Sequence, residues 1–415
     1  NDSPRGRIYL MRAAREGRLS YASETFERHI NRCLGCRACE PVCPAGVEYG
    51  QLLEIARAEL FNISTSSEKQ KGFVRLPSGG MNYWLLHFIL RYVWSKPNRL
   101  RLLFFISRLI RDSGLTWLLL KTRLLKVFSP AAYFGLHLLH SSQQQSPDHP
   151  IVDSQNSCDT SKNVLLFRGC VTDGLFKRVN EATKRVLKVN GCAVSVPEKQ
   201  ICCGALHAHA GDLEGARSLA RKNIEAFELE STGEPIITNA GGCGAMLVTY
   251  GHLLENDQEF AERAQRFSSR VRDISQQLEE LEESNMSGIQ SGASPYSMIV
   301  TCDMSCHLIN GQHAGLAAQK MFTYISGLNL VELNGADVCC GAAGVYNLME
   351  QSLSGQILRE KIENIRRSGA SVLATGNPGC HMQIGAGARL AGLDIKVCHP
   401  VELLDESYRK AGLYR

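Results

Sequence analysis

The sequence lacks the glycine-rich loops that bind nucleotide phosphates. No G-x-G-x-x-G follows the first expected strand of either α/β part, and no Walker-type loop occurs. A strong charge of one sign is also missing, since 46 Lys and Arg face 41 Asp and Glu, and the formal net charge of +5 gives no reason to expect nucleic acid. Charges interrupt every long apolar stretch, which argues against a transmembrane helix. We recognise no catalytic apparatus and therefore predict no catalytic residue in this chain.

Cysteine is abundant, with 16 residues in 415. A disulfide-rich secreted protein is a poor interpretation, because the chain is large and its thiols cluster in short motifs flanked by Gly and Pro. Metal or cluster ligation in a reducing compartment explains the pattern better.

One cysteine pattern occurs twice. The first copy reads C-x31-CC-x39-C and the second reads C-x32-CC-x39-C. The residues are Cys170, Cys202, Cys203 and Cys243 in the first copy, and Cys306, Cys339, Cys340 and Cys380 in the second. Four thiols at repeated spacing predict two metal or cluster sites on a duplicated domain. A redox disulfide between vicinal cysteines is the alternative.

A denser motif lies near the start of the chain. Cys33, Cys36, Cys39 and Cys43 form C-x2-C-x2-C-x3-C-P, the bacterial ferredoxin run for a [4Fe–4S] cluster. A structural zinc site is the alternative, but zinc motifs usually pair two C-x2-C units across a longer gap. In two-cluster ferredoxins the fourth cysteine ligates the other cluster. We therefore expect Cys43 to reach a second cluster and a partner run to lie upstream of Asn1, which agrees with a first residue other than Met.

Apolar periodicity predicts a mixed fold of α+β and α/β class. Short apolar strands alternate with helices after residue 163, which implies parallel sheets with helices packed outside. The predicted strands are 164–167, 193–196 and 235–238, then 298–301, 328–332, 371–375 and 394–397. The repeat cysteines follow strands or open helices, so the topology should gather them at the carboxyl ends of the sheet.

These patterns divide the chain into six parts. They are a helical ferredoxin-type module (1–62), truncated at its start, a basic and apolar helical connector (63–140), a linker (141–162), a first cysteine-rich α/β repeat (163–276), a linker (277–297) and a second repeat (298–415). Within the connector, residues 83–128 contain nine Lys or Arg and one acid, Asp112. Such helices rest on anionic lipid or pack against protein, and amphipathicity alone does not separate the two.

The motifs resemble those of a known family, the iron–sulfur subunits of glycolate oxidase, over essentially the whole chain. The resemblance is carried by the run from Cys33 to Pro44, by both Cys-Cys-Gly segments, by Ser3-Pro-Arg-Gly-Arg7 and by Asn377-Pro-Gly-Cys-His-Met-Gln383. Heterodisulfide reductase subunits, lactate-utilisation proteins and anaerobic glycerol-3-phosphate dehydrogenase share the Cys-Cys-Gly repeats. In some of these the repeat ends in C-x2-C, whereas here Met246 and Gln383 occupy the fifth position.

The resemblance implies an electron-transfer subunit of a 2-hydroxy-acid dehydrogenase. It would hold [4Fe–4S] at the ferredoxin run and further iron–sulfur clusters in the repeats. FAD would reside only on partner subunits that oxidise glycolate, with D-lactate as a second candidate substrate. Electrons would pass to quinone or another membrane acceptor, and the complex would be cytoplasmic and peripheral at the inner face of the membrane. The alternatives are a subunit of lactate or glycerol-3-phosphate dehydrogenase or of a disulfide reductase and, in a different class, a zinc-stabilised scaffold.

The remaining cysteines and the histidines receive plainer interpretations. Cys158, Cys192, Cys302 and Cys398 are expected to be linker or core thiols. Six histidines near the cysteine turns are expected to hydrogen-bond around a cluster rather than to ligate it: His207, His209, His307, His313, His381 and His399.

Overall fold

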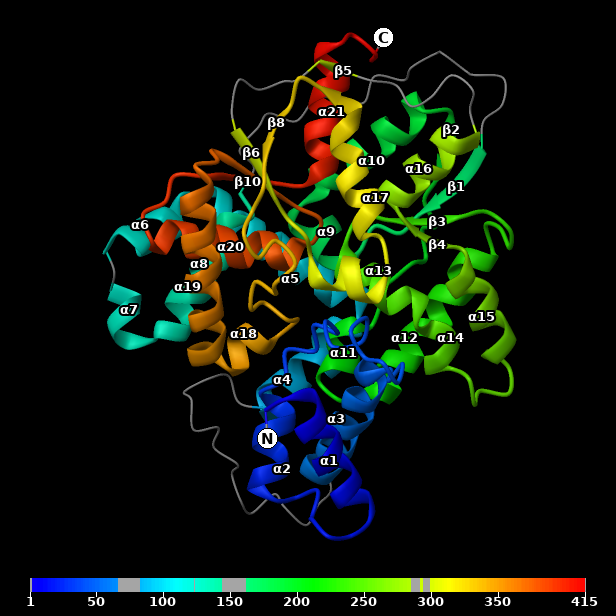
Figure 1. Ribbon diagram of the computed structural model, residues 1–415, viewed down its shortest axis with the longest axis vertical. Coiled ribbons are helices and arrows are strands. Elements are labelled where there is room, and N and C mark those ends of the chain that lie inside the picture. The colour runs from blue at the N-terminus through cyan, green and yellow to red at the C-terminus, as the bar shows by residue number, and fades with distance from the viewer. Residues whose placement is uncertain are drawn as a thin grey trace.

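A computed structural model describes residues 2–65, 83–122, 124–143, 162–284, 292–293 and 299–414. Two α/β repeats lie side by side, and the N-terminal helices project below them (Figure 1). Cys158 and most of both predicted linkers fall outside the described residues.

The N-terminal module consists of three helices, α1 (Pro4–Arg15), α2 (Glu24–Asn31) and α3 (Tyr49–Thr65). The Ser3 and Ser23 hydroxyls cap α1 and α2 by accepting backbone N–H groups. Phe26, Ile30 and Leu53 are almost fully buried between the helices. The four cysteines of the ferredoxin run lie in the loop between α2 and α3, which contains neither helix nor strand.

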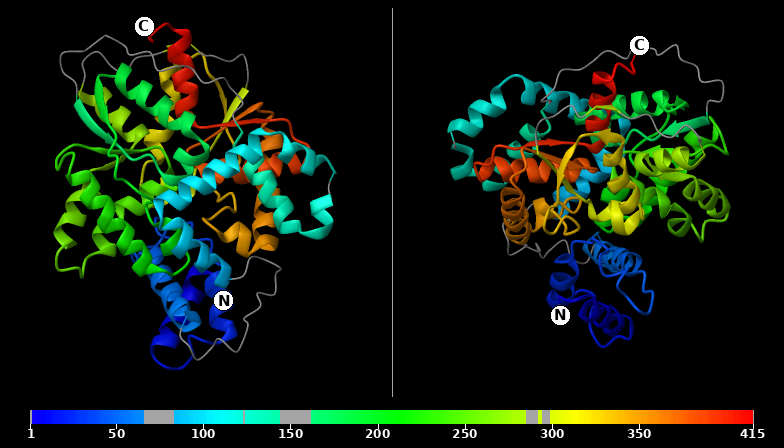
Figure 2. Two further views of the ribbon diagram at one scale, coloured as in Figure 1. Left: turned by 180° about the vertical axis from the view of Figure 1, so that it is seen from behind. Right: turned by 45° about the horizontal axis from the view of Figure 1, so that its top comes forward.

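The described residues of the connector form six helical elements. They are α4 (Tyr83–Ile89), the π-helical turn η2 (Leu90–Trp94), α5 (Pro97–Asp112), α6 (Leu115–Thr122), α7 (Leu124–Phe128) and α8 (Pro130–Ser141). From behind, α5 runs across the back of the two repeats (Figure 2). The Ser141 hydroxyl at the end of α8 donates to the Met382 carbonyl, so the connector is attached to the second repeat as well as the first.

The first repeat contains the sheet β2-β1-β3-β4, and every pair in it is parallel. Its strands are β1 (Lys162–Leu166), β2 (Cys192–Ser195), β3 (Ile236–Thr238) and β4 (Val271–Asp273). Its helices are α9 (Cys170–Leu175), α10 (Lys177–Val189), α11 (Ala205–His209), α12 (Leu213–Glu228), α13 (Gly241–Val248), α14 (Tyr250–Leu253), α15 (Ala261–Ser269) and α16 (Ile274–Ser284). Helix α16 runs across residue 277, where the predicted linker begins.

The second repeat has the same topology. Its parallel sheet is β10-β9-β6-β8, so the first, second, third and fourth strands take the same order, 2-1-3-4, in both repeats. The strands are β6 (Ile299–Asp303), β8 (Asn329–Val331), β9 (Val372–Thr375) and β10 (Lys396–Cys398), and β5 (Gly292–Ala293) pairs separately with β7 (Ile325–Ser326). The helical elements are η3 (His307–Gly311), α17 (Gly315–Lys320), η4 (Met321–Tyr324), α18 (Tyr346–Met349), α19 (Gln351–Ser368), α20 (Pro378–Leu390) and α21 (Pro400–Lys410). The predicted parallel α/β repeats are confirmed.

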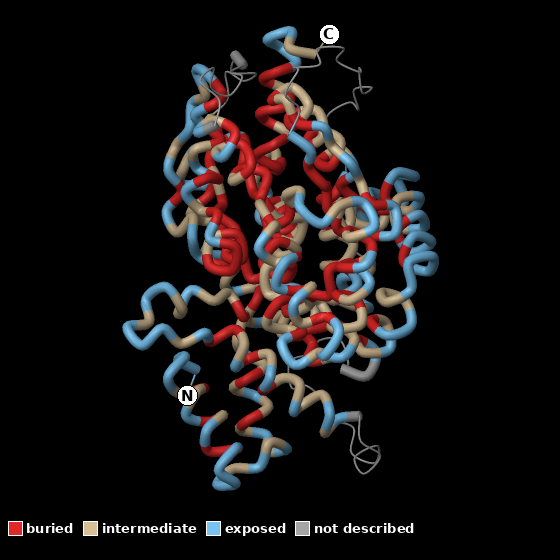
Figure 3. The backbone as a smooth tube through the Cα atoms, turned by 90° about the vertical axis from the view of Figure 1, so that its right-hand side faces the viewer, coloured by how far each residue is buried: buried red, intermediate tan, exposed pale blue. Residues whose placement is uncertain are grey.

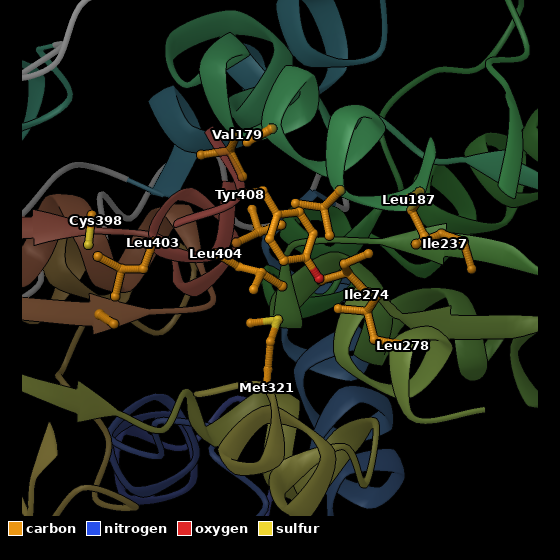
Figure 4. Close-up of a cluster of buried hydrophobic side chains, with 14 of the residues drawn as sticks. Val179, Leu187, Ile237, Ile274, Leu278, Met321, Cys398, Leu403, Leu404 and Tyr408 are labelled. Atoms are coloured by element: carbon orange, nitrogen blue, oxygen red, sulfur yellow. The ribbon is translucent and has the colours of Figure 1, made fainter. Parts of the chain in front are cut away.

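One hydrophobic core joins the two repeats. Figure 4 shows side chains of α10, α16 and α21 meeting around Tyr408 and Met321. Tyr408 is fully buried, and burying a side chain of this size contributes roughly 2 kcal/mol. Arg178 pairs with Glu402 at 2.7 Å and Arg185 with Asp405 at 2.8 Å across the same contact. Buried residues concentrate inside the two repeats (Figure 3).

Candidate iron–sulfur centres

The first-repeat cysteines lie beyond the carboxyl ends of the parallel strands. Cys170 follows β1 and opens α9, and Cys243 follows β3 in the first turn of α13. The strand order reverses between β1 and β3, and ligands of open α/β sheets bind at this point. Cys202 and Cys203 enter the same region on the loop after β2. The predicted gathering of these four residues therefore occurs.

The four sulfur atoms form contacting pairs. The Cys170 and Cys202 Sγ atoms are 3.5 Å apart, and those of Cys203 and Cys243 are 3.6 Å apart. Gly204 turns the chain after the cysteine pair at φ 91°, where a β-carbon would also press on the Ala216 backbone at 3.3 Å. The glycine of the Cys-Cys-Gly motif is thus required by both conformation and space.

Hydrogen bonds hold this loop without using the sulfur atoms. Asn223 on α12 donates to the Cys202 carbonyl at 3.0 Å and accepts the Ile201 N–H at 2.9 Å. The Tyr250 hydroxyl donates to the Cys203 carbonyl at 2.7 Å. The thiols themselves share protons: hydrogen bonds from Cys170 and Cys203 hold the pKa of Cys202 well below its usual value. A thiolate is therefore favoured inside the set, as metal ligation requires.

The second-repeat cysteines repeat this arrangement. The thiols of Cys306 and Cys339 hydrogen-bond each other, and so do those of Cys340 and Cys380. Hydrogen bonds from Cys306 and Cys340 again lower the pKa of the central thiol, Cys339. Gly341 has φ 87°, matching Gly204. Asn377 donates to the Cys380 sulfur at 3.4 Å.

In the N-terminal loop, hydrogen-bond donors contact the sulfur atoms of cysteines. Cys33 Sγ accepts the Gly35 N–H at 3.4 Å and the Tyr49 hydroxyl at 3.6 Å. Backbone N–H groups of Val47 and Ala45 lower the pKa of the half-buried Cys43 thiol. Donors of this kind stabilise thiolates and cluster sulfur.

The N-terminal loop reaches the second repeat through Cys36. The Cys36 carbonyl accepts a hydrogen bond from Asn310 in η3 at 3.0 Å. Burial raises the pKa of Cys36 to about 11, and the charges of Cys339 and its own neighbours Cys33 and Cys39 add to this shift. The ferredoxin run and the second-repeat cysteines are therefore electrostatic neighbours.

Arg57 connects the same loop to the first repeat. Its guanidinium donates to the Cys33 carbonyl at 2.6 Å and to the His209 carbonyl at 3.1 Å. The rings of His209 and His307 lie 5.2 Å apart, so one histidine from each repeat meets at this junction. Sequence reasoning did not identify Arg57, Asn310 or Asn223, because nothing in their local motifs marks them.

The other cysteines among the described residues lie in strands or in the core. Cys192 and Cys398 are buried in the hydrophobic core, and burial raises their pKa to about 11 and about 12. Cys302 lies in β6 and contacts the Met304 sulfur at 3.8 Å. At the fifth position of each repeat, Met246 is buried in the core, and the Gln383 amide bonds both Asn347 and Ser354.

The histidines make few contacts with sulfur. His307 approaches the Cys306 sulfur at 3.7 Å through Nδ1. His207 bonds Ser95 at 3.0 Å, His399 caps α21, and His381 packs against Phe176. His313 adopts a positive φ of 56°.

The donor chemistry fits iron–sulfur clusters. Each repeat gathers four cysteines and the N-terminal loop gathers four more, and thiolates are the ligands that these clusters take. Among the described residues, no three His, Cys, Asp or Glu side chains converge on a position for a single metal ion. The assignment of each cysteine to a cluster remains a prediction.

Comparison with known proteins agrees with the duplication. The cysteine-rich domain family (CCG) matches residues 164–248 and 296–385, so this is a protein with two cysteine-rich domains. It is 37% identical over 412 residues to the probable glycolate oxidase iron–sulfur subunit of Bacillus subtilis, covering 99% of this chain and 88% of that protein. The chain therefore belongs to the family of glycolate oxidase iron–sulfur subunits.

Two further relatives extend the comparison. The glycolate oxidase iron–sulfur subunit of Escherichia coli is 28% identical over 413 residues, covering 99% of this chain and 89% of that protein. Lactate utilization protein A of an Exiguobacterium strain is 32% identical over 249 residues, which is 60% of this chain and 99% of that protein.

Proposed function

We propose that this chain is the iron–sulfur electron-transfer subunit of a 2-hydroxy-acid dehydrogenase complex, with glycolate as the substrate of the complex. Cys33, Cys36 and Cys39 would hold a [4Fe–4S] cluster, and Cys43 would contribute to a neighbouring one. The two sets of four repeat cysteines would hold further iron–sulfur clusters. When bound, such clusters supply one-electron redox chemistry.

Partner subunits carrying FAD would perform the oxidation. Conversion of a 2-hydroxy acid to the 2-oxo acid releases two electrons and two protons, and reduction of a quinone to the quinol consumes the same number. The chain's own residues hold the redox centres and provide docking surfaces, which is why no acid–base residue is needed here. The names of the glycolate and lactate relatives support this substrate class.

The observation that carries the proposal is the continuity of the three cysteine groups. Cys36 lies within electrostatic reach of Cys306 and Cys339. The two repeats meet at the turns before their fourth cysteines, Cys243 and Cys380. There the Gly241 N–H donates to the Gly376 carbonyl at 3.0 Å and the Gly242 N–H to the Asn377 side chain at 3.3 Å. Electrons entering at any group would thus have a short route to the other two.

The connector supports contact with a membrane surface. Leu102, Phe105, Ile106 and Leu109 share one face of α5 and are 45–58% exposed. Leu115, Trp117 and Leu118 on α6 are also exposed, and basic residues flank these side chains on α5, on α6 and on the segment before α5: Arg91, Lys96, Arg99 and Lys121. Exposed apolar side chains with flanking cations match an anionic lipid surface. None of the described helices has the length and apolar composition that crossing a bilayer demands.

Anaerobic purification with the flavoprotein partners tests the proposal. Adding glycolate should bleach the visible absorbance and produce electron paramagnetic resonance signals from reduced iron–sulfur clusters, whereas a non-hydroxylated acid such as acetate should do neither. Purified complex that lacks acid-labile sulfide, or that contains zinc in its place, would overturn the electron-transfer role.

A further inference from the structure

We propose that the cavity between α5 and the first cysteine-rich repeat binds the quinone headgroup. This inference rests on the proposed function and gives its electron acceptor a location. The cavity encloses about 510 Å³, within the range of small-molecule sites. Its walls come from η2 and α5 on one side and from the residues around Cys170 and Cys202 on the other.

Two of the four first-repeat cysteines line this cavity. Cys170 and Cys202 contribute to its wall, whereas Cys203 and Cys243 do not. The cavity is therefore a space beside the cysteine set rather than its interior. A ligand bound there would lie directly against the predicted redox centre.

The mouth of the cavity opens on the apolar face of the connector. Leu102 and Phe105 line the cavity and are 58% and 50% exposed. Both belong to the α5 face that we assign to the membrane surface. A hydrophobic molecule entering from lipid would pass these two side chains, beside the exposed Arg101 that also lines the cavity.

Aromatic side chains provide a surface for a flat ring. Trp94 lines the cavity, interacts with the Cys170 thiol and packs edge-on against Phe104, with ring centroids 5.8 Å apart. Its buried indole N–H is the group that interacts with the thiol, so Trp94 offers a ligand the face of its ring rather than a hydrogen bond.

Cationic donors complete the site. Arg101, Arg108 and Arg168 line the cavity together with one acid, Asp173. Arg108 donates to the Gly174 carbonyl at 2.8 Å, and within the described part of the chain no carboxylate pairs with any of the three arginines. Guanidinium groups suit ligand oxygens that carry partial or developing negative charge. Apolar walls, an aromatic surface and cations at the sulfur end match a quinone better than a small hydrophilic acid, which would leave the apolar walls unused.

Equilibrium dialysis of the purified full chain tests the site. The probe is 2,3-dimethyl-1,4-naphthoquinone, whose quinone ring has no open position for addition of a cysteine thiol. We expect saturable binding of one molecule per chain. Trp94→Leu and Arg101→Gln should each weaken it about three- to tenfold.

Two matched controls lie on the same connector. Trp117→Leu removes an exposed tryptophan of α6, and Arg99→Gln removes an α5 arginine that bonds the Tyr92 carbonyl, and neither residue lines the cavity. Both variants should bind the probe like the unmodified chain. Absence of saturable binding, equal loss in test and control variants, or displacement of the probe by millimolar glycolate would each overturn the quinone assignment.

The two experiments distinguish failure of the quinone site from failure of the proposed function. If glycolate reduces the centres of the complex but the quinone does not bind in this cavity, the location is wrong and the electron-transfer role stands. If the quinone binds but glycolate reduces nothing, the site stands and the proposed donor is wrong.

Discussion

The two cysteine-rich repeats share a topology and a cysteine pattern, yet they support their Cys-Cys-Gly turns differently. The buried faces of α12 and α19 correspond residue by residue, and Asn223 in the first repeat stands where Lys361 stands in the second. Asn223 bonds the cysteine loop directly. Lys361 instead pairs with Asp303 at 2.8 Å, both side chains being 2% exposed. Phe167 occupies the position of Asp303 in the first repeat.

The same arrangement of cysteines is therefore compatible with two kinds of supporting contact, a set of neutral hydrogen bonds in one repeat and an ion pair in the other. Burial lowers the pKa of Lys361, but the attraction of Asp303 outweighs it and raises the value overall. The ammonium therefore remains charged within electrostatic reach of Cys340 and Cys380, whereas at the corresponding place in the first repeat Asn223 offers a neutral hydrogen bond. A positive charge stabilises nearby thiolates, so the two sets lie in different electrostatic surroundings.

The largest expected effect concerns the cysteines themselves. Cys203→Ala should remove the iron of the first repeat alone, and Cys340→Ala that of the second, because a set of three thiols no longer completes either site. Iron and acid-labile sulfide analysis of the anaerobically purified chain measures this. Cys192→Ala, which alters a core thiol, should leave both contents unchanged. Unchanged iron in Cys203→Ala and Cys340→Ala would contradict the predicted ligands.

The ion pair gives the next largest effect. Lys361→Met leaves Asp303 buried without its counter-charge and should cost about 3–5 kcal/mol of unfolding free energy. Asn223→Ala in the first repeat should cost less, about 1–3 kcal/mol, because only neutral hydrogen bonds are lost. Urea unfolding of the full chain compares the two variants. The double variant Lys361→Met with Asp303→Leu should recover most of the loss, and a double variant as unstable as Lys361→Met would show that the pair is not the cause.

The caps of the fourth-strand helices should respond oppositely to acid. His399 Nδ1 accepts the Val401 N–H, and Asp273 Oδ1 accepts the Ser275 N–H, at corresponding places after β10 and β4. Burial lowers the pKa of His399 from 6.5 to about 4, so its contribution to stability is complete above pH 6.5 and lost as the pH falls towards 4. Burial raises the pKa of Asp273 from 3.8 to about 6, so stability is gained as the pH falls through that range.

Asparagine variants separate these two effects. His399→Asn should reduce the loss of stability between pH 7 and pH 5 by about 1–2 kcal/mol, and Asp273→Asn should increase that loss by a similar or smaller amount. Unfolding midpoints at the two pH values provide the measurement. Shifts of the same sign in both variants would contradict the prediction that the two helix caps respond oppositely to acid.

The smallest effect concerns Tyr250, which lies seven residues after the fourth cysteine of the first repeat. It has no equivalent in the second repeat, where Gly387 occupies that position. Tyr250→Phe removes the bond to the Cys203 carbonyl and should cost about 1–2 kcal/mol. Thermal unfolding checks this. Tyr408→Phe serves as the comparison, since its hydroxyl is also buried but bonds Asn190, far from any thiol. Only the Tyr250 variant should also loosen iron retention.

Sequence patterning predicted most strands because apolar runs of this length are distinctive. It missed β4, whose sequence Val-Arg-Asp is too short and polar to stand out, although the repeat offered a guide in the predicted strand before residue 398. The sequence from 175 to 189 has helical periodicity, but α10 begins only at Lys177, because Phe176 leaves helical geometry between α9 and α10. Spacing predicted that each set of cysteines would gather.

Contacts between distant segments were beyond the sequence. The proximity of Cys36 to Cys339 depends on how the N-terminal module docks, and no local pattern encodes docking. Trp94 is an unremarkable connector residue until the π-helical turn places it against Cys170. The correspondence between Asn223 and Lys361 becomes visible only when α12 and α19 are aligned by their buried residues.

The packing of α21 onto α10 has a consequence for synthesis of the protein. Arg178 and its partner Glu402 are 224 positions apart, so the apolar side of α10 stays uncovered while everything between them is translated. During that interval the nascent first repeat exposes this apolar surface, which chaperones would have to shield. The contact between α10 and α21 can therefore form only when nearly the whole chain has been synthesised.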